Sequence, residues 1–206
     1  METLQLNADF GTAIMRAAGV LRAGGVILYP TDTLYGLGAD AFSDQAVDTV
    51  YAIKGRQADK PIHCIVTDLA MAEEYGEIND AARTLAEAFL PGPLTLVVKK
   101  KADISGGIAR GMETIGIRIP NNDFCIELAR SFGRPYTTTS ANLADVEPEI
   151  AFKKVLAQLG TSQIDLAIDA GDAPLKEPST VVNVVSGHPS ILREGAIPAK
   201  DILGLF

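Results

Sequence analysis

Two short polar segments carry the residue types that a triphosphate site requires. The first contains Lys54, Arg56 and Lys60, and the second runs from Ser140 to Asn142. Arginine presents a planar fork of donors and lysine a point charge, and both match phosphate oxygens. Serine and asparagine add neutral donors and acceptors for a polar ligand beside the phosphates. A charge run by itself is more often a solvated surface, so the interpretation requires a fold that brings the two segments together.

Further polar residues stand at the ends of predicted strands. Arg118 lies inside an apolar strand, where its guanidinium either reaches the wet face of the sheet or points into a pocket and binds an anion. The segment 30–38, which includes Thr33, follows a buried strand directly, and ligands of α/β folds bind in such loops. Its Pro, Thr and Gly residues are equally typical of a plain connection. Arg193 ends the last predicted strand, and a surface pair with Glu194 is the commoner alternative there.

The sequence lacks the motifs of several other chemistries. No Walker-type glycine loop and no Gly-x-Gly-x-x-Gly stretch opens a helix, so a phosphate site would depend on side chains. His63 and His188 stand at neither a triad nor a zinc spacing, and no resident metal site is predicted. Asp32 and Asp169 are isolated carboxylates that could help to hold Mg²⁺, but their spacing does not show it.

Composition and charge restrict the class of partner. The chain has 206 residues with 47% apolar and 21% charged, which is enough to bury a core without disulfides. A net charge of −8 and 6% aromatic residues disfavour a nucleic-acid or anionic-membrane surface, and they make a local cluster of cations more informative. Cys64 and Cys125 are expected to be buried, reduced thiols. Without a secretory signal or a long apolar run, we expect a soluble, cytoplasmic protein.

Helix and strand patterns alternate along the whole sequence. Helices are predicted from Phe10 to the Gly24-Gly25 stop, from Ser43, from Asn79 to before Pro91, from Asn122 to Gly133, over 148–159 and from Pro198. Strands are predicted at 26–29, 94–98, 115–119, 136–139 and 166–169, with a closing hairpin of 181–185 and 189–193. The pattern predicts one mixed α/β (α+β) domain over 1–206, with three layers and a mixed sheet.

The order of several motifs resembles the YrdC/TsaC family over roughly residues 10–197. The motifs are PTDTLYGL at 30–37, KGR and KP at 54–56 and 60–61, LPGPLT at 90–95, GIRIP at 116–120, SAN at 140–142, STVV at 179–182 and ILREG at 191–195. The resemblance implies a twisted mixed sheet whose concave face holds a cationic cavity. It also implies the short, single-domain form of the family.

Members of this family are threonylcarbamoyl-AMP synthases. The resemblance therefore implies L-threonine, bicarbonate and ATP as substrates, with Mg²⁺ accompanying the ATP. The product supplies N6-threonylcarbamoyladenosine in tRNA, so TsaD-type transfer proteins are implied as downstream partners and tRNA as an indirect one.

The resemblance also assigns roles to individual residues. The implied catalytic residues are Lys54 and Arg56. The implied nucleotide contacts are Arg56, Lys60, Thr114, Asn142 and Arg193. The implied threonine contacts are Thr33, Arg118, Ser140 and Ser179, with Arg118 on the carboxylate.

The chain departs from the usual family pattern at three places. The segment 143–148 replaces a loop with Ser-Gly, Asn183 stands where Asp is usual, and Ile65 stands where His is frequent. A YciO-like branch keeps the fold without the basic and Ser-x-Asn motifs, both of which this chain retains. Two rivals stay open besides that paralogue: an RNA-binding module that uses the same cationic hollow, and a carbamoyl-phosphate-using transferase.

Overall fold

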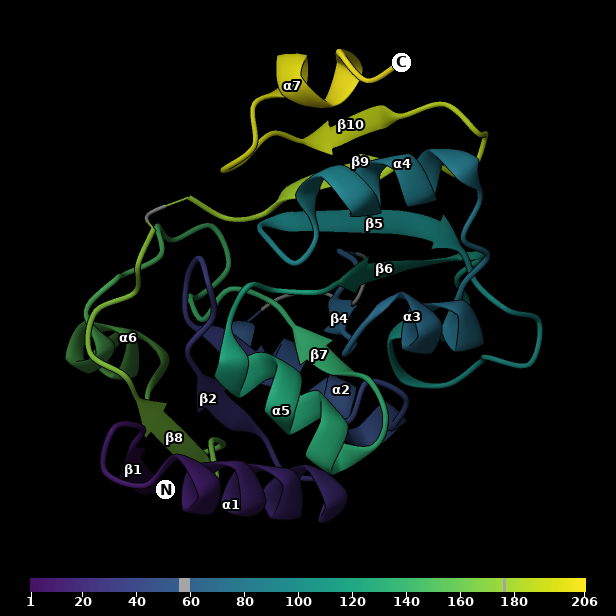
Figure 1. The fold of residues 1–206 in the computed structure, drawn as a ribbon. Helices are drawn as coiled ribbons and strands as arrows, with labels where there is room; N and C mark the ends of the chain where they lie inside the picture. Colours follow the sequence, from purple (N-terminus) through teal and green to yellow (C-terminus); the bar gives the residue numbers. More distant parts are fainter. Residues whose placement is uncertain (56–59, 176) are drawn as a thin grey trace.

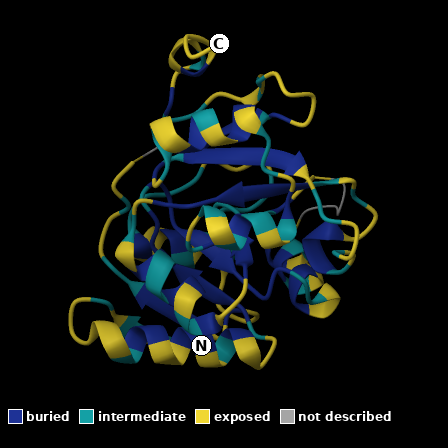
Figure 2. Ribbon diagram, turned by 45° about the vertical axis from the view of Figure 1, so that its right-hand side comes forward, coloured by how far each residue is buried: buried dark blue, intermediate teal, exposed yellow. Residues whose placement is uncertain are grey.

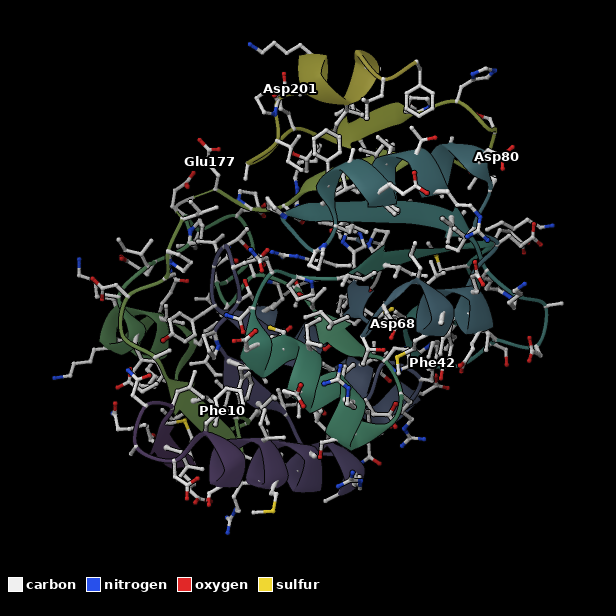
Figure 3. The ribbon with its side chains drawn as sticks, viewed as in Figure 1. Phe10, Phe42, Asp68, Asp80, Glu177 and Asp201 are labelled. Carbon is white, nitrogen blue, oxygen red and sulfur yellow. The ribbon has the colours of Figure 1, made fainter. Side chains whose placement is uncertain are left out.

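Side-chain caps fix where most helices begin in the computed structural model, which describes residues 1–55, 60–175 and 177–206. The side chains of Ser43, Asn79 and Asn122 each accept a hydrogen bond from the first turn of the helix that follows. Asp68 caps α3 in the same way, and Asp80 opens α4 (Figure 3). The helices are α1 Phe10–Arg22, α2 Asp44–Lys54, α3 Leu69–Tyr75, α4 Asp80–Phe89, α5 Asp123–Phe132, α6 Phe152–Leu159 and α7 Ala199–Leu203, with a 3₁₀ turn at Gly107–Ala109.

Within the described residues the strands form two mixed sheets (Figure 1). The smaller sheet has the order β1-β8-β2-β3, and the larger has the order β10-β9-β5-β6-β4-β7. Each sheet combines parallel and antiparallel pairs. The strands are β1 Glu2–Gln5, β2 Ile27–Tyr29, β3 Gly36–Gly38, β4 His63–Ile65, β5 Leu94–Lys99, β6 Thr114–Arg118, β7 Tyr136–Thr138, β8 Leu166–Asp169, β9 Thr180–Asn183 and β10 Ser190–Arg193.

The two sheets are joined where β3 passes β7. The backbone N–H of Leu37 donates to the carbonyl of Thr139 at 3.0 Å, and that of Thr137 donates to the carbonyl of Ala39 at 2.8 Å. The Thr137 hydroxyl adds a bond to the Leu37 carbonyl at 3.0 Å. This junction holds the segment that precedes β3 against the larger sheet, so the polar residues of that segment reach the sheet.

Apolar side chains of the helices pack against apolar side chains of the sheets and form two buried cores. One core lies between α2, α4 and the larger sheet and contains Val50, Leu85 and Leu96. A second core contains Leu21 of α1 and Leu128 of α5, which lie side by side and pack on the smaller sheet (Figure 1). Figure 2 shows the inner strands buried and the helices turning exposed faces outward, while the edge strands β1 and β10 are intermediate or exposed. This division follows the amphipathic spacing of the helices.

The larger sheet presents its two faces to different surroundings, because side chains alternate along a strand. Leu96 and Ile117 point into the core under α2 and α4. Their sequence neighbours Thr95 and Arg118, together with His63 of β4, point to the opposite face, where they line a hollow. We call the face that carries Thr95, Arg118 and His63 the site face.

The predicted mixed α/β fold is confirmed, but the strands form two mixed sheets where one was expected, and several elements differ. The helix predicted over 148–159 begins only at Phe152, because Ala151 forms an antiparallel bridge with Asp172 and keeps the preceding chain extended. The segment 36–38, predicted as part of a loop, is strand β3 and pairs with β2. The short elements β1, β4 and α3 were not predicted.

Candidate functional site

A hollow of about 110 Å³ opens on the site face. Its walls are mostly hydroxyls and cationic groups from both sheets and from the segments between them. We call it the polar hollow, and its polar side chains are Thr31, Thr33, Tyr35, His63, Thr95, Arg118, Thr138, Thr139, Ser140, Ser179 and Arg193. The fold thus brings together residues that lie far apart in the sequence.

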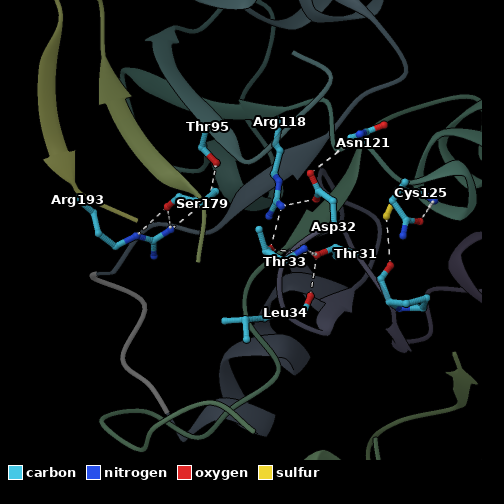
Figure 4. Close-up of polar contacts among 12 residues, drawn as sticks. Thr31, Asp32, Thr33, Leu34, Thr95, Arg118, Asn121, Cys125, Ser179 and Arg193 are labelled. Atoms are coloured by element: carbon cyan, nitrogen blue, oxygen red, sulfur yellow. Dashed lines mark hydrogen bonds and ion pairs between the residues drawn. The ribbon is translucent and has the colours of Figure 1, made fainter. Parts of the chain in front are cut away.

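Arg118 forms the floor of the polar hollow and is 5% exposed. One terminal nitrogen donates to Asp32 at 2.5 Å and to the Thr33 hydroxyl at 2.9 Å (Figure 4). Its Nε is buried and has no hydrogen-bond partner among the described residues. The carboxylate of Asp32, which was considered above as an Mg²⁺ ligand, accepts hydrogen bonds from the Arg118 guanidinium and from the backbone N–H of Asn121. Of the two alternatives for Arg118, the structure has the one that points into a pocket.

Local hydrogen bonds shape the segment that carries Thr33. The Thr31 hydroxyl donates to the carbonyl of Leu34 at 2.7 Å and accepts the N–H of Thr33 at 3.0 Å. The two threonine hydroxyls also lie 3.1 Å apart. Such side-chain bonds replace backbone pairing in a turn. They fix the Thr33 hydroxyl against Arg118, as Figure 4 shows.

Ser179 and Arg193 meet on the opposite wall. The Ser179 hydroxyl lies 2.9 Å from the hydroxyl of Thr95, and the Arg193 guanidinium donates to the Ser179 carbonyl at 2.8 Å (Figure 4). Thr95 is fully buried and pairs with Arg118 across β5 and β6. No role was predicted for Thr95. Its place at the end of the LPGPLT motif was the available signal.

A β-bulge directs Arg193 toward the site face. Ile191 is opposite Val182, but Arg193 is opposite Val181, so two steps of β10 match one step of β9. Ile191 packs on the helix-covered core. Without the bulge Arg193 would share that side, since residues two apart point the same way. The described contacts of Arg193 and Glu194 are to other groups: Arg193 donates to the Ser179 carbonyl, and the Glu194 carboxylate accepts the N–H of Ala199.

Lys54, which the family resemblance predicts to be catalytic, lies at the edge of the site. It ends α2 and is 3% exposed, and its ammonium donates to the carbonyls of Ser140 at 2.5 Å and Asn142 at 2.8 Å. The carbonyl of Lys54 in turn accepts the N–H of Ala144 at 2.8 Å. Among the described residues, Lys54 does not line the polar hollow. Its contacts hold the Ser-x-Asn segment at the edge of the site.

The remaining predicted nucleotide contacts are not all in the polar hollow. We call Lys60 and the segment 142–146 the entrance segments, because they adjoin the lining residues Pro61 and Ser140 in the sequence. Arg56 lies outside the described residues. Lys60 is exposed and pairs with Asp145 at 3.3 Å. The Ser140 hydroxyl donates to Asn142, whose amide donates to the carbonyl of Val146 at 2.7 Å. Ser140 lines the polar hollow, whereas the Asn142 side chain is bound to its own loop.

A second hollow, of about 130 Å³, continues along the site face. Its walls are mainly apolar, and we call it the apolar hollow. Its residues are Pro61, Ile62, His63, Val97, Ile108, Met112, Thr114, Ile115, Gly116, Asn183 and Leu192. Thr114, a predicted nucleotide contact, therefore lies here and not in the polar hollow. Pro61 and His63 line both hollows.

Cys64 and Cys125 are buried, as predicted, and are not joined in a disulfide. Burial raises the pKa of both the Cys64 and the Cys125 thiol to about 12, so neither is a thiolate at neutral pH. The described residues contain no group of three or more His, Cys, Asp or Glu side chains placed to hold a metal ion. They also contain no helix that is long and apolar enough to span a membrane.

One protein-family model matches most of this sequence. The model of the Sua5, YciO and YrdC proteins, described as "Telomere recombination", matches residues 19–195. This chain belongs to the Sua5/YciO/YrdC family. The matched span contains every strand of the larger sheet and all described walls of both hollows. The resemblance inferred from the motifs is thereby confirmed.

Several relatives within the Sua5/YciO/YrdC family are named threonylcarbamoyl-AMP synthase. The mouse protein is 36% identical over 89% of this chain and 67% of its own length. The proteins of Pyrococcus abyssi and Bacillus subtilis are 34% and 35% identical over 90% and 92% of this chain. The chain spans only 55% of the length of those two relatives.

Solved structures of the Sua5/YciO/YrdC family superpose closely. P. abyssi Sua5 complexed with L-threonine has a TM-score of 0.87 at 33% identity, over 93% of this chain and 56% of that chain. Escherichia coli YciO has a TM-score of 0.84 at 28% identity, over 93% of both chains. A HypF structure with a TM-score of 0.76 and 22% identity, over 88% of this chain and 29% of that chain, shares the fold.

Proposed function

We propose that this protein is an L-threonylcarbamoyl-AMP synthase, a nucleotidyltransferase that uses L-threonine, bicarbonate and ATP. The observation that carries the proposal is the buried guanidinium of Arg118, whose Nε has no partner among the described residues and which forms the floor of a hollow lined by hydroxyls. A guanidinium that is held in place among hydroxyls at the wall of a hollow matches a ligand carboxylate through its terminal donors. The named synthases and the threonine complex of P. abyssi Sua5 support this assignment.

In the proposed complex, L-threonine occupies the polar hollow. Its carboxylate accepts from Arg118, and Asp32 keeps the guanidinium oriented through the 2.5 Å bond. The threonine hydroxyl bonds the Thr95–Ser179 pair, whose two hydroxyls can exchange donor and acceptor roles. Thr33 and Ser140 complete the proposed threonine contacts from the two sides of the hollow.

The nucleoside of ATP is proposed to occupy the apolar hollow. Val97 and Leu192 offer the apolar walls that suit the faces of a base, and Thr114 and Asn183 supply hydrogen-bonding groups. The phosphates are proposed to bind Arg193 and Lys60, which match their charge, and the family resemblance adds Arg56, which lies outside the described residues. Mg²⁺ is proposed to arrive with the ATP, since it commonly binds through substrate phosphates.

The proposed chemistry needs no protein nucleophile. The amine of threonine attacks the carbon of bicarbonate and water leaves, which gives an N-carboxylate. An oxygen of that carboxylate attacks the α-phosphorus of ATP, the bond to the bridging oxygen breaks, and pyrophosphate leaves. The protein contributes by holding the two anions together and by stabilising the charge that develops on the phosphates.

The proposed product carries an activated threonylcarbamoyl group. We propose that it serves the formation of N6-threonylcarbamoyladenosine at position 37 of tRNA, through TsaD-type transfer proteins. Such an intermediate is a mixed anhydride, so a protein that consumes it must act before water does. In this proposal tRNA receives the threonylcarbamoyl group from the transfer proteins and does not bind in the polar hollow.

Pyrophosphate release tests the proposal. The protein is incubated with ATP, L-threonine and bicarbonate, and each substrate is omitted in turn. If pyrophosphate is released only when all three substrates are present, the proposal is supported. If pyrophosphate is released at the same rate without threonine, the proposal is contradicted. Arg56→Ala is expected to lower the rate on the order of 10²-fold or more, because it removes a charge donor from the phosphates.

A YciO-like protein is the second candidate, because E. coli YciO matches this chain over 93% of both chains. Thermal shifts separate the candidates, since a ligand that binds the folded state raises its stability. A synthase is stabilised by ATP and threonine together. Salt-sensitive stabilisation by RNA without either ligand would instead indicate the RNA-binding module.

A further inference from the structure

His63 stands at the boundary between the polar and the apolar hollow. Among the described residues, it shares this position with Pro61, which has no side-chain donor. The imidazole of a histidine carries at least one N–H donor in either charge state. A ligand that fills both hollows must therefore pass this ring.

The sheet is built so that the His63 ring can lie on the site face. His63 pairs with Thr138 on one side, and β6 runs along the other side of β4. A Cβ at Gly116 of β6 would lie 2.2 Å from Cδ2 of the His63 ring. Two non-bonded heavy atoms cannot lie that close together. The imidazole therefore occupies the space that a side chain at Gly116 would take. A glycine at this strand position thus permits the close approach of the ring.

The positions of the other site groups define what would lie beside His63. Arg118 and the Thr95–Ser179 pair lie in the polar hollow, and they are the proposed contacts for the far ends of the amino acid. The apolar walls Val97 and Leu192 lie in the other hollow. If the amino acid and the nucleoside fill these two spaces, the bond that forms between them crosses the boundary. The reacting atoms are then the N-carboxylate and the α-phosphate.

We infer that His63 is a substrate-contacting residue at the reaction centre, where its ring N–H donates to an oxygen of the α-phosphate or of the attacking carboxylate. This inference rests on the proposed function. The hydrogen bond strengthens as negative charge develops on the phosphorus oxygens in the transition state. His63 forms and breaks no covalent bond in this role, and the proton stays on the ring. Its contribution is to the rate of the chemical step, not to the binding of threonine.

A matched pair of substitutions tests the inference. His63→Phe keeps a planar ring over Gly116 without any donor, and His63→Gln keeps donors without the ring. His63→Phe is expected to lower kcat for pyrophosphate release on the order of 10²-fold, while KM for L-threonine and ATP stays close to the parent value. His63→Gln should recover most of that loss.

Each outcome decides the inference separately from the proposed function. A parent protein without threonine-dependent pyrophosphate release contradicts the proposed function itself. An active parent and an equally active His63→Phe variant overturn the role of His63. A His63→Phe variant that no longer binds L-threonine in calorimetry also overturns it, because His63 would then belong to the threonine site. Equal losses in His63→Phe and His63→Gln exclude the donor role.

Gly116→Ala provides a second test that leaves the histidine in place. The added methyl group must displace the His63 ring from the boundary. We expect a loss of kcat similar to that of His63→Phe, with threonine binding retained. If His63→Phe fails to fold, this variant decides the inference: normal turnover in Gly116→Ala overturns it.

Discussion

The polar hollow and the entrance segments differ in burial and in the number of contacts that hold their side chains. Arg118, Thr95 and Ser179 are at most 5% exposed, and hydrogen bonds join each of them to neighbouring groups. At the entrance, the side chains of Lys60 and Asp145 are 57% and 85% exposed and make a single ion pair at 3.3 Å. The floor of the site is therefore preorganised, whereas the contacts at the entrance can rearrange at little cost.

This difference predicts which substrate each region controls. Buried, mutually bonded groups lose little freedom when a ligand arrives, so they favour selective binding of a small, rigid group. An exposed ion pair is worth little, and a phosphate can replace the carboxylate in it. We therefore expect changes in the polar hollow to affect threonine and changes at the entrance to affect ATP. Four substitutions test this comparison, from the largest expected effect to the smallest.

Arg118→Met is expected to have the largest effect. It leaves the carboxylate of Asp32 buried without its cation, which costs about 3–5 kcal/mol of folding stability. It also removes the proposed threonine contact, so binding of L-threonine in calorimetry should be lost. The double variant Asp32→Asn with Arg118→Met should regain much of the stability, measured by denaturant unfolding, without regaining threonine binding. Recovery of both would contradict the assignment of Arg118 to the ligand.

Lys54→Met tests the support of the Ser-x-Asn segment. Bonds from a charged donor contribute about 1.5–3 kcal/mol each, and this substitution removes those to the carbonyls of Ser140 and Asn142. We expect a lower melting temperature and a raised KM for ATP, with a smaller change in KM for threonine. A loss of kcat at unchanged stability would instead support the catalytic role first expected for Lys54.

Thr95→Val tests the hydroxyl pair on the floor of the polar hollow. Valine keeps the shape of threonine but removes the partner of the Ser179 hydroxyl, at a cost of about 0.5–1.5 kcal/mol. KM for L-threonine should rise up to about tenfold while KM for ATP is unchanged. Thr95→Ser serves as the matched control and should behave like the parent. An equal effect of both substitutions would show that packing, not the hydroxyl, matters at this position.

Asp145→Asn is expected to have the smallest effect. It removes an exposed ion pair, so the free energy of unfolding should change by less than about 1 kcal/mol. Asparagine tolerates the left-handed backbone of this position, where φ is 58°. With Lys60 released, the affinity for ATP should rise slightly, and more at low salt than at high salt. A large loss of ATP binding would mean that Asp145 contributes to the site directly.

The sequence predicted those parts of the fold that local chemistry determines. Ser43, Asn79 and Asn122 cap helices as expected, because capping needs only the residue and the turn that follows. The strand at 36–38 was missed, because its pairing with β2 and β7 overrides two glycines that usually indicate a turn. The start of α6 was misplaced for a similar reason, since a distant partner, Asp172, holds Ala151 extended.

The candidate site was predicted where motifs and charges coincide. Arg118, Thr33 and Ser179 line the polar hollow, and the family resemblance had grouped them. Thr95 was missed because a threonine in an apolar strand is ordinary, and its partner Ser179 is 84 residues away. The contacts of Lys54 were equally invisible, because the carbonyls that it binds have no signal in a sequence.

The bulge between Ile191 and Arg193 makes spacing as informative as residue identity. If the bulge were lost at the same chain length, the sequence would still end in an arginine before Glu194 and would still match a loosely written motif, but the guanidinium would face the helices and no longer reach Ser179. If the residue between Ile191 and the arginine were deleted, the arginine would stay on the site face, because adjacent residues of a strand point to opposite sides. When homologous sequences are sorted into active and inactive branches, the number of residues between the counterpart of Ile191 and this arginine should therefore be counted, not merely the presence of the arginine.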